Sequence, residues 1–208
     1  MAGTEQRNMG YAGFGRNHWF NSKELALISA LSSLWIVSEI YLGPVISQIT
    51  QVHGVVQRAL GWLLMLTLAA LTGRFGRVAT MAFIVSTATR IVRPGQIYSL
   101  FVGFGYALGG LAFDLLYFFP IAKNLNGKAE RVYLLSISLF SGAIALIPYL
   151  LFNLSVLGFH NFIIWFPFYT PNMVKSVALN VFGTLIGISI LPRIQVWAPK
   201  IKYSKVPL

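Results

Sequence analysis

Long apolar stretches constrain this chain more than any other feature of its sequence. A helix needs about 20 mostly apolar residues to cross the hydrocarbon core of a bilayer. Only 10% of the 208 residues are charged, whereas about 25% are charged in an ordinary soluble domain. The sequence therefore predicts an all-α integral membrane protein, a six-transmembrane-helix bundle in the lipid bilayer. The six predicted spans are residues 24–46, 55–71, 77–91, 97–119, 132–152 and 173–191.

The chain divides into three parts around these spans. Residues 1–23 form a polar N-terminal segment that lacks the apolar run of a signal peptide. Residues 24–192 form the transmembrane domain, and residues 193–208 form a basic tail. Between the fifth and sixth spans, residues 155–172 are apolar and aromatic but contain Gly158, Pro167 and Pro171. We interpret this connection as an interfacial or re-entrant cap.

The distribution of basic residues predicts the orientation of the bundle. With the N-terminus in the cytoplasm, only four of the 16 lysines and arginines lie outside: Arg58, Arg90, Arg93 and Lys175. Cytoplasmic loops of membrane proteins carry an excess of such residues, so we expect both termini to be cytoplasmic. The same rule accounts for the net charge of +11, and no nucleic-acid partner is expected.

Ionisable residues near the outer ends of the spans are the strongest candidates for a functional site. Glu39 lies in the outer third of the first span, and a charged side chain at the centre of a span costs about 2.5–3.5 kcal/mol. We therefore expect Glu39 to face the bundle interior and to meet one of the outer cations. Long arginine and lysine side chains can instead extend to the interface without a functional role. The histidines of the outer connections, His53 and His160, could likewise be interfacial bystanders.

Two further features concern the packing of the helices. Asp114 lies near the cytoplasmic end of the fourth span and is predicted to pair with Arg74 or Arg77. Ala26 and Ala30 are four residues apart on the first span, a spacing that allows another helix to approach closely. For the glycines of the fourth and sixth spans, packing within the bundle is the favoured explanation.

Missing residues and motifs exclude several kinds of chemistry. The chain has no cysteine, which excludes disulfides, thiolate metal sites and cysteine nucleophiles. It has no phosphate-binding glycine loop, no His-Glu-x-x-His zinc helix and no Gly-x-Ser-x-Gly elbow. We therefore expect no catalytic residues, no bound metal and no cofactor, and the chain cannot itself supply ATP hydrolysis.

Three stretches resemble one family of membrane proteins. ALISA (residues 26–30) is similar to an alanine-rich docking face, and FGYALGGLAFDLLYFF (residues 104–119) is similar to a glycine-rich fourth helix. VKSVALNVFGTLIGISILPRI (residues 174–194) is similar to a last helix with a polar outer start. With six predicted helices and both termini inside, the chain resembles the substrate-binding S-component of energy-coupling factor (ECF) transporters over residues 23–193.

The resemblance implies a function and a set of partners. The chain would be the high-affinity substrate-binding subunit for uptake of a vitamin or similar micronutrient across a prokaryotic plasma membrane. A membrane scaffold subunit, expected to contact Ala26 and Ala30, and two ATPase subunits would drive transport. The connections after the first and fifth helices would help to close an outward-facing pocket.

The predicted substrate site draws on the outer halves of the helices and on the outer connections. The arginines and the lysine would hold anionic groups through charge-assisted hydrogen bonds. Glu39 would orient a cation or balance the excess positive charge, and the aromatic residues would stack on a planar ring. The fifth connection would contribute polar groups that close the pocket. The expected residues are Trp35, Glu39, His53, Arg58, Trp62, Arg90, Tyr98, Asn153, His160, Asn161 and Lys175.

Two other functions are compatible with the sequence. A small integral membrane enzyme acting on lipids or isoprenoids would need an acid–base pair near the interface. Glu39 with His53 or His160 is the candidate pair. A non-transport scaffold subunit of a membrane complex would instead use the outer charges to bind a neighbouring protein.

Overall fold

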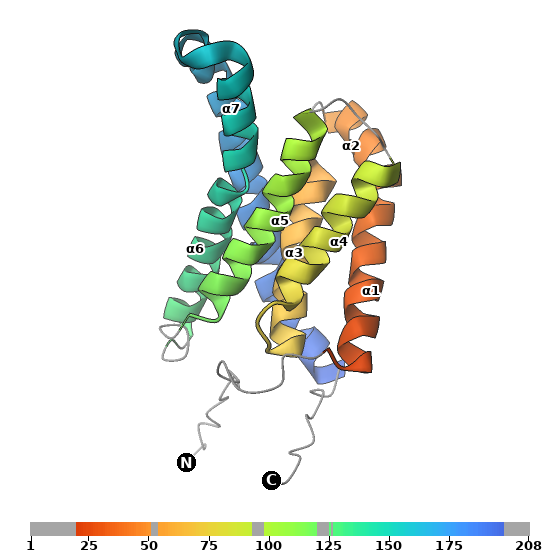
Figure 1. Ribbon diagram of the computed structural model, residues 1–208. Helices are drawn as coiled ribbons and strands as arrows, with labels where there is room; N and C mark the ends of the chain where they lie inside the picture. Colours follow the sequence, from red (N-terminus) through yellow and green to blue (C-terminus); the bar gives the residue numbers. More distant parts are fainter. Residues whose placement is uncertain (1–19, 51–53, 93–97, 120–124, 126, 198–208) are drawn as a thin grey trace.

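The computed structural model describes residues 20–50, 54–92, 98–119, 125 and 127–197 (Figure 1). Most of the predicted N-terminal segment, His53, Arg93 and the tail beyond residue 197 lie outside the described residues. So does the side chain of Tyr98, although its backbone belongs to a described helix. The fold is therefore discussed for the remaining part of the chain.

Every regular element in the described residues is a helix. The helices stand side by side, and α2 lies at the end of the bundle opposite the start of α1 (Figure 1). Four helical stretches are long and apolar enough to cross a membrane: Ser22–Ile49, Val55–Thr72, Leu100–Tyr117 and Lys128–Ile194. The predicted membrane helical bundle is thus confirmed in its general form. The helices are α1 (Ser22–Val37), α2 (Gly43–Thr50), α3 (Val55–Thr72), α4 (Arg77–Val92), α5 (Tyr98–Tyr117), α6 (Lys128–Ile144) and α7 (Ile147–Trp197).

Helix α1 begins at a reciprocal cap and buries one stripe of residues. The side chain of Asn21 accepts a hydrogen bond from the backbone of the first turn, and the Glu24 side chain reaches back to the N–H of Asn21. This capping box satisfies backbone donors that a helix N-terminus leaves without partners. The stripe recurs every three or four residues, as one face of an α-helix does. It consists of Glu24, Ile28, Ser32 and Trp35.

A π-helical turn, η1 (Ser38–Leu42), separates α1 from α2. The predicted first span is therefore not one uniform α-helix, although its backbone stays helical from residue 22 to residue 50. π-helical turns are rare and occur frequently at functional sites. Glu39 lies inside this turn.

Helix α3 lies at the centre of the bundle and packs against α7 through small residues. Trp62, Met65, Leu66 and Leu68 of α3 are fully buried. A Cβ atom added to Gly183 of α7 would collide with the backbone of Ala59 in α3. The glycine pair of the sixth predicted span thus packs inside the bundle, which confirms the sequence-based explanation.

Helix α7 is longer than the sequence predicted. The predicted fifth span, residues 132–152, is interrupted at Ala145 and Leu146, between α6 and α7. Of the three residues expected to interrupt residues 155–172, only Gly158 has a non-helical backbone (φ 73°, ψ 162°), while Pro167 and Pro171 lie within the helix. The expected irregular cap is instead a helical hairpin that extends past the α2 end of the bundle (Figure 1).

Candidate functional site

A cluster of polar residues lies at the α2 end of the bundle and draws on four elements. Glu39 comes from η1, Gln57 and Arg58 come from the first turn of α3, Arg90 comes from the last turn of α4, and Tyr106 comes from α5. We call these five residues the polar cluster. Three of them, Glu39, Arg58 and Arg90, were predicted from the sequence. Gln57 and Tyr106 were not.

Glu39 is held by a neighbouring amide group. The Nε2 atom of Gln57 donates a hydrogen bond to Oε1 of Glu39, and both side chains are half-buried. This bond joins η1 to α3. The hydrogen bond from Gln57 lowers the cost of placing this carboxylate in an apolar part of the chain.

Tyr106 lies within electrostatic range of the three charged residues of the polar cluster. Electrostatic interactions with Arg58, Glu39 and Arg90 all reach its phenol group. Its side chain is only 5% exposed. Within the described part of the chain, its hydroxyl group has no hydrogen-bond partner. A buried hydroxyl without a partner is uncommon in proteins and calls for an explanation.

Arg90 reaches the cluster across a glycine of the neighbouring helix. A Cβ atom on Gly103 of α5 would lie 3.2 Å from Nε and 3.4 Å from Cγ of Arg90. Gly103 and Tyr106 are three residues apart and so share one face of α5. The absence of a side chain on Gly103 therefore lets Arg90 lie along the face that carries Tyr106. Nε of Arg90 is buried and, among the described residues, has no hydrogen-bond partner.

Two tryptophans next to the polar cluster along the chain, Trp35 before Glu39 and Trp62 after Arg58, are fully buried. The ring of Trp35 meets that of Tyr106 edge-on, with 6.2 Å between the ring centroids. Trp62 lies one turn along α3 from Arg58, and its Nε1 donates to Oγ of Ser141 in α6 at 3.0 Å. The Nε1 atom of Trp35, by contrast, is buried without an acceptor in the described residues. Both tryptophans were predicted as site residues.

Four further predicted site residues, Asn153, His160, Asn161 and Lys175, lie on α7. Asn153 is half-buried and donates to the backbone oxygen of Tyr149, at 2.8 Å. Asn161 is exposed and donates to the backbone oxygen of Leu157, at 3.1 Å. Both amides thus bond to their own helix. The side chains of His160 and Lys175 are exposed.

A second charged group lies at the opposite end of the bundle. Glu24 is fully buried, and its carboxylate forms ion pairs with Arg74 at 3.2 Å and with Arg77 at 2.7 Å. The guanidinium of Arg77 also lies 4.1 Å from the centre of the Phe20 ring. These contacts fasten the start of α1 to the connection between α3 and α4.

The pairing predicted for Asp114 is not the one found. Arg74 and Arg77 both form ion pairs with Glu24, which was not among the residues predicted to pair with them. Asp114 instead accepts a hydrogen bond from the backbone N–H of Ala79, at 2.8 Å, in the first turn of α4. A carboxylate in that position satisfies a free helix donor and is favoured by the helix dipole. Asp114 therefore has a structural role, as predicted, but its partner is the backbone of Ala79 and not an arginine.

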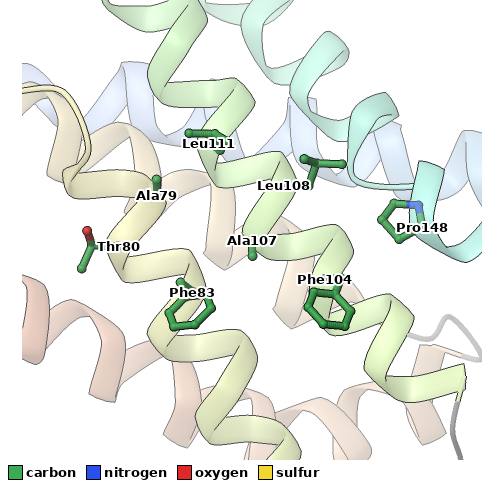
Figure 2. Close-up of a pocket in the computed structure, with 8 residues that line it drawn as sticks. All are labelled: Ala79, Thr80, Phe83, Phe104, Ala107, Leu108, Leu111 and Pro148. Atoms are coloured by element: carbon green, nitrogen blue, oxygen red, sulfur yellow. The ribbon is translucent and has the colours of Figure 1, made fainter.

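An apolar groove on the outer surface between α4 and α5 is separate from the polar cluster. It has a volume of about 510 Å³ and is lined by Ala79, Thr80, Phe83, Phe104, Ala107, Leu108, Leu111 and Pro148 (Figure 2). The rings of Phe83 and Phe104 are 59% and 63% exposed. Such a surface suits lipid chains better than a polar solute.

Two of the five cluster residues were missed because their sequence signals are weak. Tyr106 lies in a glycine-rich run, where only its spacing from Gly103 places both on one helix face. Gln57 is an uncharged residue next to Arg58, so it drew no attention as an ionisable group. In the described residues no group of three or more histidine, aspartate or glutamate side chains is placed to hold a metal ion.

No model of a known protein family, no curated protein and no solved structure matches this chain. Its polar cluster and the apolar helical bundle that carries it are therefore the features that bear on its function.

Proposed function

We propose that this chain is a membrane protein that binds a small polar solute in the polar cluster. The observation that carries the proposal is the set of buried donors around Tyr106 that have no acceptor among the described residues. Hydrogen-bonding groups buried in a membrane bundle are costly when they lack partners. A bound solute would supply the missing partners, and residues arriving from four elements would hold it in one orientation.

We further propose that the solute is taken up from outside the cell. With six spans and both termini in the cytoplasm, the polar cluster lies at the outer end of the bundle, and the Glu24 network lies at the inner end. The exposed face of α1 supports docking of a membrane scaffold, because Ala26 and Ala30 are both exposed on it. These features agree with a substrate-binding subunit like the ECF S-component, acting with separate ATPase subunits on a vitamin or similar micronutrient.

The enzyme alternative has less support from the geometry. Its acid–base pair would join Glu39 to a histidine. Glu39 is bonded to Gln57, and the side chain of His160 is exposed on α7. His53 lies outside the described residues.

Mass spectrometry of small molecules extracted from the purified full-length protein tests this proposal. We expect one polar metabolite in near-equal amount to the protein. Arg58→Gln should lose this metabolite, whereas Arg131→Gln, which changes an exposed arginine at the start of α6, should retain it. A preparation that contains only membrane lipid would contradict solute binding.

A further inference from the structure

We infer that the polar cluster recognises a solute through a single negatively charged group, such as a carboxylate. This inference rests on the proposed solute-binding function and specifies the chemical class of the solute. The sequence alone left two roles for Glu39, orienting a cation or balancing excess positive charge. The structure favours the second.

The charged side chains of the polar cluster do not balance one another within the described residues. Arg58 and Arg90 contribute two positive charges near Tyr106, and Glu39 contributes one negative charge. These described residues thus carry one positive charge in excess. An uncompensated charge is costly in a partly buried site, because the surroundings solvate it less well than water does. One negative group on the solute would neutralise the cluster.

The buried atoms around Tyr106 that lack hydrogen-bond partners in the described residues are donors. Nε of Arg90 and Nε1 of Trp35 are buried without acceptors in the described part of the chain, and so is the hydroxyl group of Tyr106. Guanidinium and indole N–H groups can only donate hydrogen bonds, and a tyrosine hydroxyl can donate one. The missing partner must therefore present acceptor atoms. A carboxylate is an acceptor-only group, and its hydrogen bonds to charged donors are the strong ones.

The one acid of the polar cluster, Glu39, already accepts a hydrogen bond within the protein. Oε1 of Glu39 accepts from Gln57. A cationic solute would have to compete with this bond while its own donors faced Arg90 and Trp35. The arrangement therefore disfavours an amine and favours an anion.

The cluster is also built for close approach between helices. A side chain on Gly61 of α3 would collide with the ring of Trp35, and a side chain on Gly103 would crowd Arg90. The absence of side chains at these two positions sets Trp35 and Arg90 close to their neighbouring helices. The donors thus come from three helices, α1, α4 and α5, and do not depend on one helix terminus.

Three probes of similar size test the charge of the recognised group. Benzoate is an anion, benzamide is neutral and benzylamine is a cation. We expect benzoate to change the tryptophan fluorescence of the purified full-length protein at concentrations about 10-fold to 100-fold lower than benzamide does, the difference that one charge-assisted hydrogen bond gives. Arg90→Gln should remove this preference, and Arg131→Gln should keep it.

A pair of tyrosine variants separates binding from folding. Tyr106→Phe removes a hydroxyl that has no hydrogen-bond partner among the described residues, so it should lower benzoate affinity about 10-fold without lowering the thermal stability of the solute-free protein. Tyr133→Phe removes a hydroxyl that donates to the backbone oxygen of Leu116 at 2.7 Å. That control should lower stability and leave benzoate affinity unchanged.

The outcomes distinguish the inference from the proposed function. Preference for benzylamine or benzamide, lost in Arg90→Gln, would overturn the anionic class while leaving solute binding intact. An equal response to all three probes, or none, would overturn the anionic class. If no metabolite co-purifies either, the proposed function fails with it. A drop in stability for Tyr106→Phe with unchanged benzoate affinity would show that the hydroxyl is structural, and would also overturn the inference.

Discussion

At the scale of single residues, the structure gives the two glutamates of the first helical stretch, Glu24 and Glu39, different surroundings. Glu39 is half-buried, is bonded to an amide, and interacts electrostatically with Tyr106, as Arg58 and Arg90 also do. Glu24 is fully buried and bound to two arginines directly. The first arrangement leaves donors without acceptors, as a binding site does. The second brings the carboxylate and its cations together, as a structural contact does.

Replacement of Glu39 by glutamine tests its role in the polar cluster. Glu39→Gln keeps an acceptor for Gln57 but raises the excess charge near Tyr106 by one. We expect benzoate to bind the variant at least as tightly as it binds the wild-type protein, because the anion then meets more positive charge. A loss of benzoate affinity, measured by fluorescence titration, would mean that Glu39 contacts the solute itself.

Replacement of Glu24 should damage stability and not binding. Removing one partner from a buried ion pair costs about 3–5 kcal/mol, because the opposite charge stays buried without compensation. Glu24→Gln should therefore lower the denaturation temperature of the detergent-solubilised protein strongly. Glu130→Gln, which changes a half-buried acid in the first turn of α6, is the control. Equal effects of the two changes would contradict the structural role of Glu24.

At the scale of elements, the sequence predicts where helices form better than how they face one another. Apolar runs of span length place α3, α4 and α5 within one or two residues of their observed ends. The π-helical turn and the helical backbone of α7 at Pro167 and Pro171 were not predicted. Hydrophobicity along the chain does not encode either feature.

The candidate site shows the same division between sequence and structure. The cost of a charge in lipid was enough to single out Glu39, Arg58 and Arg90 as candidates for a site. It could not supply Gln57 and Tyr106, because helix rotation decides which neutral polar residues join the charges. It also assigned the wrong acid to Arg74 and Arg77, since Glu24 resembled an ordinary residue of a helix first turn.

The contact between α3 and α7 leads to a prediction about stability. Gly183→Ala places a methyl group against the backbone of Ala59, and overpacking of this kind costs about 1–3 kcal/mol. Gly43→Ala is the matched control, because a Cβ atom there meets nothing within 4 Å and alanine favours a helix by about 0.5–1 kcal/mol. Thermal denaturation should show a loss for the first variant and none for the second. The reverse order would contradict the packing of α7 on α3.

At the scale of the whole molecule, the two ends of the bundle are chemically different. One end carries the polar cluster and the other carries the ion pairs of Glu24. Because the chain has no cysteine, single cysteines can report which end faces outward. Lys175→Cys should react with a membrane-impermeant maleimide in intact cells, and Lys128→Cys should react only after permeabilisation. The opposite pattern would place the polar cluster at the cytoplasmic face and contradict uptake from outside.

Native mass spectrometry of the intact protein released from detergent tests the central claim most directly. The claim is that the polar cluster holds a small polar solute. The wild-type protein should carry one small-molecule adduct, which Arg131→Gln retains and the double variant Arg58→Gln/Arg90→Gln loses. A wild-type protein without an adduct, or a double variant that keeps the adduct, would contradict the claim.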